Sequence, residues 1–181
     1  FDNVIAITIS ANLSGSYEAA SMARNIVLDE YAREHEGVIS GKNIHLVDSR
    51  AAGGKLEVLV TELSRYLNNN DPTFEQAVAF IDNIEDKSQV LFSLSSYENL
   101  TKNGRMPRLA GTLASRLNIR VLGTASHEGT IKIVGPARGE KKMAKKIMAT
   151  MESVGFSGGL VYIDHVENEP AALQLKQTIL E

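Results

Sequence analysis

The feature that most constrains this chain is an apolar run that ends in a loop rich in hydroxyl groups. Residues 4–9 are apolar apart from one threonine, which is typical of a buried strand, and an amphipathic helical pattern begins soon after. The loop between them carries Ser10, Asn12, Ser14 and Ser16. Neutral donors beside the free N–H groups of a helix start are suited to holding an anionic group. The same pattern is more often that of an ordinary helix cap, with Ser14 or Ser16 bonded to the first turn.

Composition narrows the class of protein. The chain has 181 residues, 43% of them apolar and 23% charged, which is a globular composition long enough for one or two domains. A net charge of −3 argues against a nucleic-acid or anionic-membrane surface. The lack of cysteine excludes disulfides and fits a reducing, cytoplasmic location, and no apolar run approaches the roughly 20 residues of a membrane span. Because the sequence opens directly on a strand without Met, we expect it to be part of a longer protein.

The first half of the chain alternates strands with helices. This rhythm predicts a parallel sheet with helices packed against it. The predicted strands cover residues 4–9, 43–47 and 89–94, and the predicted helices cover 19–37, 54–67 and 74–84.

The second half has a different pattern and predicts a separate module. A short helix is expected at 97–102 and another at 107–117, followed by a strand at 119–124 that turns at 127–129 into a second strand at 131–134. A basic helix at 141–154, a strand at 160–166 and a helix at 171–180 complete the pattern. The predicted fold class is therefore α/β: a partial parallel sheet with flanking helices in residues 1–95, then an α+β domain in residues 96–181.

Five segments, in order, carry a resemblance to a known family. They are residues 9–17 (ISANLSGSY), Val47-Asp48-Ser49 with Gly53-Gly54, residues 100–106 (LTKNGRM), residues 117–120 (LNIR) and residues 137–139 (ARG). Together they cover essentially the whole chain, and their order resembles the DegV family of bacterial fatty-acid-binding proteins.

The resemblance implies two α/β domains with one acyl chain held between them. Its carboxylate would be held by hydroxyl and backbone N–H groups of the first domain, while the second domain would cover the acyl-chain tunnel. Such a carrier is not an enzyme and needs no cofactor; it presents a long-chain fatty acid to a fatty-acid kinase for phospholipid metabolism. Ser10 is the first choice for a direct contact. The ligand-binding residues that the resemblance implies are Ser10, Ala11, Asn12, Ser14, Gly15 and Ser16.

The resemblance also assigns residues away from the loop. Arg105 and Arg108 would form a positive patch at the tunnel mouth that meets the kinase or the membrane surface; the alternative is a solvated surface turn. Apolar walls are expected from Leu109, Leu113 and Leu117, for which ordinary core packing is the alternative. Two features of the family are missing from this sequence: an N-terminal Thr-Ser-Gln-Pro-like element and a strand beyond Glu181. Ala11 also stands where the family often has a second serine.

Two other functions compete with the carrier. An acyl hydrolase or transferase would use Ser10 or Ser14 as a nucleophile, but the sequence offers no recognisable base and no Gly-x-Ser-x-Gly element. A module that binds phosphorylated metabolites would hold a phosphate with the same loop. The four histidines are dispersed without metal-ligand spacing, so no metal site is expected.

Overall fold

The computed structural model describes residues 2–106 and 119–181, which form two compact units. The first unit comprises Phe1–Ser88 with His127–Thr130, and the second comprises Gln89–Ser126 with Ile131–Glu181. The division after Ser88 falls before the boundary expected near residue 95. The helix predicted at 107–117 lies outside the described residues, as do Arg108, Leu109, Leu113 and Leu117.

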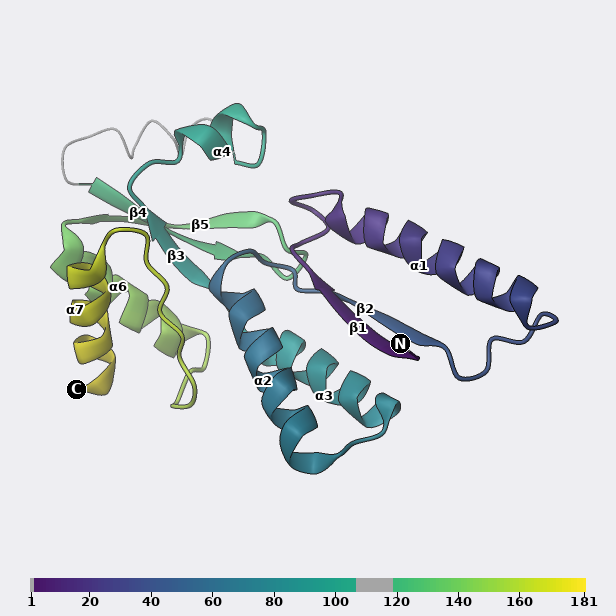
Figure 1. Cartoon of the computed structure of the whole chain (residues 1–181). Helices are drawn as coiled ribbons and strands as arrows, with labels where there is room; N and C mark the ends of the chain where they lie inside the picture. The colour runs from purple at the N-terminus through teal and green to yellow at the C-terminus, as the bar shows by residue number, and fades with distance from the viewer. Residues whose placement is uncertain (1, 107–118) are drawn as a thin grey trace. The chain divides into compact units, whose positions relative to one another are not determined.

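The first unit is built on a two-stranded parallel sheet. Its strands pair in register from Asn3 opposite Asn43 to Thr8 opposite Asp48. Helix α1 covers one face of this sheet, and α2 and α3 cover the other (Figure 1). In chain order the elements are β1 (Asn3–Thr8), α1 (Ser16–Glu34), β2 (Asn43–Asp48), α2 (Gly54–Asn70) and α3 (Phe74–Lys87).

The core of the first unit lies between the sheet and the α2–α3 pair. Its buried members come from one strand and from matching faces of two helices: Val47, Leu59, Leu63, Ala77 and Ile81. Thr73 begins α3 with a capping box, because its hydroxyl accepts from the Gln76 N–H while the Gln76 side chain accepts from the Thr73 N–H. Helix α1 differs from α2 and α3 in having no buried residue.

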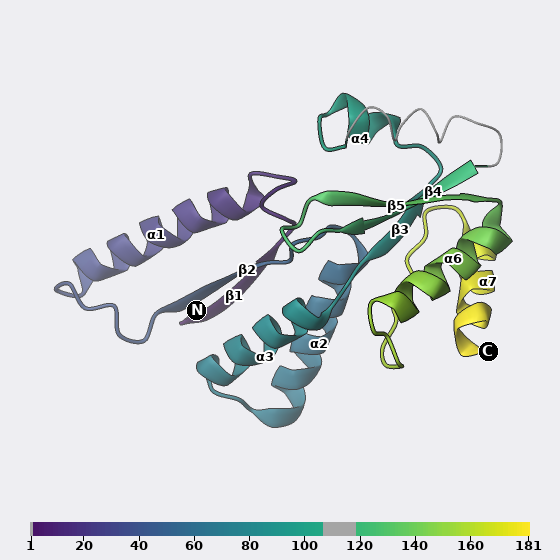
Figure 2. The ribbon, with the colours of Figure 1, turned by 180° about the vertical axis from the view of Figure 1, so that it is seen from behind.

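The second unit is an antiparallel sheet in the order β3-β4-β5. Helix α6 packs on β4 and β5, and α7 packs on α6 (Figure 2). Its core contains Tyr97, Met106 and Val121, and the Tyr97 hydroxyl donates to the Val121 carbonyl at 2.5 Å. The elements are β3 (Leu91–Leu94), α4 (Glu98–Lys102), β4 (Ile119–Ala125), β5 (Ile131–Arg138), α6 (Glu140–Ser153) and α7 (Glu169–Leu180).

The predicted fold class and most predicted elements are confirmed, but two strand assignments are wrong. The strand predicted at 89–94 does not join the parallel sheet; β3 pairs antiparallel with β4 in the second unit. Residues 160–166 form no strand, since this apolar segment pairs with no neighbouring strand and follows Gly158 and Gly159, both with positive φ. The hairpin predicted around residues 127–129 is confirmed as β4–β5.

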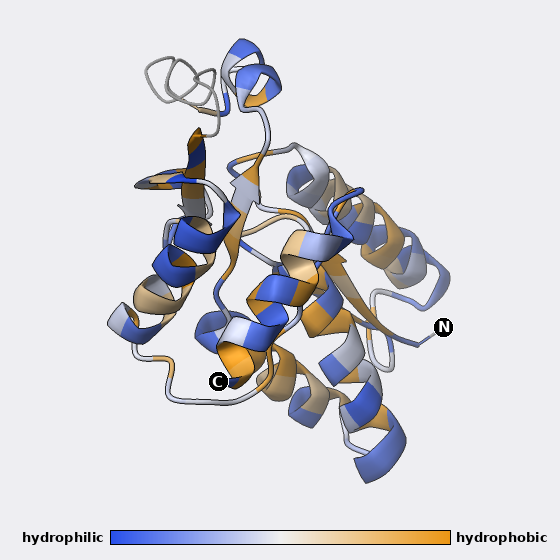
Figure 3. Cartoon of the chain, turned by 90° about the vertical axis from the view of Figure 1, so that its left-hand side faces the viewer, coloured by the Kyte–Doolittle hydropathy of each residue, from blue (hydrophilic) through white to orange (hydrophobic). Residues whose placement is uncertain are grey.

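Hydrophobic residues are not confined to the two cores. The final turn of α7, beside the label C in Figure 3, is hydrophobic, and Leu180 is 76% exposed.

Across residues 2–106 and 119–181, none of the helices has both the length and the hydropathy needed to cross a bilayer.

A pair of adjacent residues on α2 tests the assignment of the first core. Leu59 is fully buried, whereas Val60 is 55% exposed. Leu59→Ala should lower the free energy of unfolding by about 3 kcal/mol, because it leaves a cavity. Val60→Ala should change it by less than about 1 kcal/mol. Urea unfolding followed by circular dichroism measures both, and equal losses would contradict the assignment.

Candidate functional site

The candidate site lies where the two parallel strands end. Parallel strands bring their carboxyl ends to one edge of the sheet, which is where ligands bind in open α/β sheets. The two loops that leave this edge are joined by Asp48, whose Oδ1 accepts from the N–H of Ala11 at 3.2 Å and of Arg50 at 2.9 Å. The N–H of Ser10 also donates to the Ala51 carbonyl at 2.8 Å. Asp48 therefore fixes both loops, as capping residues do.

Ser10, the first choice for a ligand contact, is fully buried. Its hydroxyl donates to the Gly129 carbonyl at 2.7 Å and accepts from the Asn12 N–H at 3.2 Å. Gly129 belongs to residues 127–130, which join β4 and β5 and group with the first unit. A serine hydroxyl has one proton, and in this conformation that proton is bonded to a backbone carbonyl. The direct contact between Ser10 and a ligand thus stays a prediction.

The rest of the loop is more accessible. Asn12, Gly15 and Ser16 are exposed and Ser14 is half-buried, and the hydroxyls of Ser14 and Ser16 lie 2.8 Å apart. The cap of α1 is Gly15, and no side chain caps the helix, although Ser14 Oγ accepts from the Ser16 N–H at 3.3 Å. The structure therefore places two hydroxyls at a helix N-terminus, where the first backbone N–H groups have no partner within the helix itself.

A buried charge cluster supports the loop after β2. Glu85, on α3, accepts from Lys55 Nζ at 2.7 Å and from Arg50 Nε at 2.9 Å, and Arg50 also contacts Asp86 at 3.1 Å. The Lys55 and Glu85 side chains are only 6% and 9% exposed. Burial raises the pKa of Glu85, but the hydrogen bonds from Arg50 and Lys55 outweigh it and hold the pKa below its ordinary value. The hydrogen bond to Glu85 raises the pKa of Arg50.

Several of these groups were missed by sequence reasoning. The contact of Ser10 with Gly129 joins residues 119 positions apart, and no local pattern signals it. Thr8 Oγ1, at the end of β1, is buried without a hydrogen-bond partner in the described part of the chain. The available signal was the Asp48-Ser49 pair at a strand end, which predicts a loop fixed or a helix capped by these side chains more often than a ligand contact.

Arg105 lies in the second unit, on an exposed turn after α4. The turn follows Gly104, whose φ of +70° favours glycine, and Arg105 Nη1 donates to the Asn103 carbonyl at 3.1 Å. Its role at a tunnel mouth stays a prediction.

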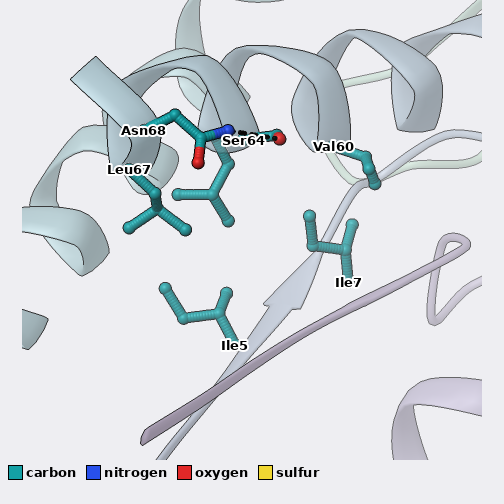
Figure 4. A pocket seen from close by; sticks show the side chains of 7 residues that line it. Ile5, Ile7, Val60, Ser64, Leu67 and Asn68 are labelled. Carbon is teal, nitrogen blue, oxygen red and sulfur yellow. Dashed lines mark hydrogen bonds between the residues drawn. The ribbon is translucent and has the colours of Figure 1, made fainter.

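A groove of about 360 Å³, lined mostly by apolar side chains but also by Ser64 and Asn68, runs between β1 and α2 (Figure 4). Ile5 and Ile7 point into it from β1, opposite Val60 and Leu67 of α2. Ile7 lies three residues before Ser10, or about 10 Å along an extended chain. The groove thus borders the same strand that ends in the hydroxyl-rich loop.

The hydroxyls of the site are bonded to neutral groups. Ser10 is bonded to a carbonyl and Ser14 to another hydroxyl; within the described residues neither is bonded to a histidine or a carboxylate that could act as a base. Nor do residues 2–106 and 119–181 contain a cluster of three or more His, Asp or Glu side chains suited to a metal ion.

Open α/β sheets that bind small ligands do so at the carboxyl ends of their parallel strands, and this unit places neutral donors there. The family model described as "Uncharacterised protein, DegV family" matches residues 1–181, and the chain belongs to the DegV family. It is 39% identical over 178 residues to a DegV domain-containing protein of Streptococcus pyogenes serotype M3, an alignment that covers 98% of this chain and 60% of that protein.

Two solved structures of similar proteins contain fatty acids. One is a DegV family protein from Eubacterium eligens loaded with heptadecanoic acid, 32% identical with a TM-score of 0.86. The other is the Streptococcus pneumoniae Fatty Acid Kinase (Fak) B3 protein loaded with linoleic acid, 35% identical with a TM-score of 0.87. Each match covers 98% of this chain, which spans about 60% of the length of these relatives.

Glu85→Gln tests the charge cluster. Near neutral pH it should lower the free energy of unfolding by about 3 kcal/mol, because Lys55 is left buried without its counter-charge. The folded-state pKa of Glu85 lies below its unfolded value of about 4.3, so this stabilisation is present above that pH and is lost as the pH falls through the folded pKa. The difference between the wild type and the variant should therefore shrink in acid.

Asp86→Asn is the matched control, because Asp86 contacts the same guanidinium but its side chain is 71% exposed. This change should alter stability by less than about 1 kcal/mol. Thermal and urea unfolding at several pH values measure both variants. A Glu85→Gln effect as small as that of Asp86→Asn would show that the cluster does not stabilise the unit.

Proposed function

We propose that this chain binds a long-chain fatty acid and holds its carboxylate at residues 10–16. The observation that carries the proposal is the accessible Ser14–Ser16 pair at the uncapped start of α1. The chain is also 32% and 35% identical to two proteins whose structures contain fatty acids. Ser10, Ala11, Asn12, Ser14, Gly15 and Ser16 are proposed to form the head-group loop, as direct donors or as its backbone.

The physical requirement on the head group is strict. A carboxylate taken out of water costs several kcal/mol unless hydrogen bonds replace its hydration. Hydroxyls and helix N–H groups supply those bonds, and the positive end of the helix dipole favours the negative charge. None of residues 10–16 is charged, so the loop would bind the carboxylate without pairing it to a fixed cation.

The acyl chain would provide most of the affinity. Burying about 14 methylenes at roughly 0.8 kcal/mol each gives a gross gain near 11 kcal/mol. Association costs about 4–15 kcal/mol, so only a preformed apolar site leaves a useful surplus. The groove between β1 and α2 offers such apolar surface close to the loop in sequence.

The neighbour that is a Fatty Acid Kinase (Fak) B3 protein supports a carrier role for this chain. We propose that the bound fatty acid is presented to a kinase that phosphorylates its carboxyl group. A head group held by neutral donors would stay nucleophilic enough for that reaction, and this chain would act as a carrier rather than as the catalyst. Arg105, with Arg108, is proposed to contact the kinase.

The double variant Ser14→Ala/Ser16→Ala tests the head-group site. It should weaken binding of a long-chain fatty acid by about tenfold, because hydrogen bonds to a charged group are the stronger kind. Binding of a fatty alcohol of equal length should change much less, since its apolar contacts are the same. Fluorescent-ligand displacement measures both affinities.

Ser40→Ala is the control, because Ser40 is an exposed loop serine of the same unit. It should leave both affinities unchanged. Equal losses for acid and alcohol in the double variant would show that these hydroxyls do not hold the head group.

Lipid extraction of the purified chain, followed by mass spectrometry, separates the proposal from its alternatives. Released, unmodified fatty acid supports the carrier. A covalent acyl-serine adduct supports a hydrolase or transferase, and a phosphorylated metabolite supports a phosphate-binding module.

Arg105→Glu tests the kinase contact. It should lower the rate of acyl-phosphate formation by a bacterial fatty-acid kinase at least several-fold, since it reverses the charge of an exposed contact. Fatty-acid affinity should stay unchanged, because Arg105 lies outside the head-group loop. Lys87→Glu, a charge reversal in the other unit, is the control. An unchanged rate for Arg105→Glu would exclude the contact.

A further inference from the structure

The turn between β4 and β5 is bonded to the head-group loop at two points. The Gly129 carbonyl accepts from Ser10 Oγ at 2.7 Å, and the Glu128 carbonyl accepts from Asn12 Nδ2 at 2.6 Å. His127 Nε2 also lies 3.5 Å from Nη1 of Arg50, in the loop after β2. Residues 127–130 therefore contact both loops that leave the carboxyl ends of β1 and β2.

Ser10 is the centre of these contacts. In addition to the two hydrogen bonds of its hydroxyl, the backbone N–H of Ser10 donates to the Ala51 carbonyl. The backbone carbonyl of Ser10 accepts from the N–H groups of Leu13 at 3.0 Å and Ser14 at 3.1 Å. The proton and one lone pair of the hydroxyl are thus in use, and the side chain is fully buried. These hydrogen bonds fix the backbone conformation of the loop that carries the hydroxyls of Ser14 and Ser16.

The contact also requires glycine at position 129. Gly129 has a φ of +80°, a conformation that other residues adopt only with strain. A Cβ at this position would overlap Ser10 Oγ and lie 2.9 Å from Arg50 Cα. The turn can approach both loops this closely only because residue 129 has no side chain.

We infer that Ser10 and the turn 127–130 form a clamp that positions the head-group loop, with Ser10 acting as a positioning residue and not as a ligand. This inference rests on the proposed function, because the clamp serves the carboxylate site formed by Ser14, Ser16 and the start of α1. Both ends of the turn continue into strands of the second unit. The clamp therefore joins the head-group loop to a turn 119 positions away in the sequence.

Gly129→Ala and Ser10→Ala test the clamp without any ligand. In the whole chain, amide hydrogen exchange by NMR should show the N–H groups of Leu13 and Ser14 exchanging at least about tenfold faster in both variants, because the backbone carbonyl of residue 10 that accepts from them is no longer held in place by the turn. Gly37→Ala is the matched control: its φ is +86°, but an added Cβ meets nothing within 4 Å. Unchanged loop exchange in both Gly129→Ala and Ser10→Ala would overturn the clamp.

Ligand affinities then distinguish positioning from direct contact. If Ser10 positions the loop, Gly129→Ala lowers the preference for fatty acid over fatty alcohol as Ser10→Ala does, although residue 129 offers no side chain to the ligand. The double variant should lose little more than either single variant, because both changes break one contact. If Ser10 is a ligand, Ser10→Ala alone lowers the preference and the exchange of Leu13 and Ser14 stays unchanged, which overturns the inference.

The exchange measurement separates this inference from the proposed function. Fast loop exchange in the variants, with no fatty-acid binding by the wild type, would support the clamp and reject the carboxylate site. Should Gly129→Ala fail to fold, Ser10→Ala gives the same readout with a smaller change.

Discussion

The parallel pairing of β1 with β2 is the constraint on which the candidate site depends. Because both strands run the same way, the loops after Thr8 and Asp48 leave the sheet at one edge. Asp48 then uses one carboxylate oxygen to hold N–H groups of both loops. An antiparallel pair would place the two loops at opposite ends of the sheet and separate the donors that they carry.

The buried charges of α2 and α3 support a loop at the same edge of the sheet. Lys55 and Glu85 are nearly inaccessible, and an ion pair this buried gains little net stability over an apolar pair of similar volume. The ion pair does impose a defined geometry, because Glu85 also accepts a hydrogen bond from Arg50. Arg50 lies in the loop after β2 and has a φ of +50°. The cluster therefore holds a strained loop against α3. Its directional hydrogen bonds select one loop conformation more strictly than apolar contacts would.

The sequence was sufficient for local structure and for the position of the loop, but not for long-range pairing. Hydropathy periods predicted β1, β2, α2 and α3, because each packs one regular face against the core, and they also predicted α1, although that helix has no buried residue. The strand at Leu91–Leu94 was placed in the wrong sheet, since an apolar run does not encode its partner. The same limit hid the contact between Ser10 and Gly129: a serine after a strand signals a donor, but not which acceptor takes its proton.

The charge arrangement explains why a loop of neutral donors suits this place. Arg50 is linked to the loop through Asp48 and to the turn through His127, and Glu85 and Asp86 both bind its guanidinium. Its charge is thus matched within the first unit before any ligand arrives. An arriving anion would then meet hydroxyls, N–H groups and a helix dipole, each a partial charge and none a counter-ion. In the proposed function, such a site would hold the carboxylate by partial charges alone and leave its full charge available for phosphorylation.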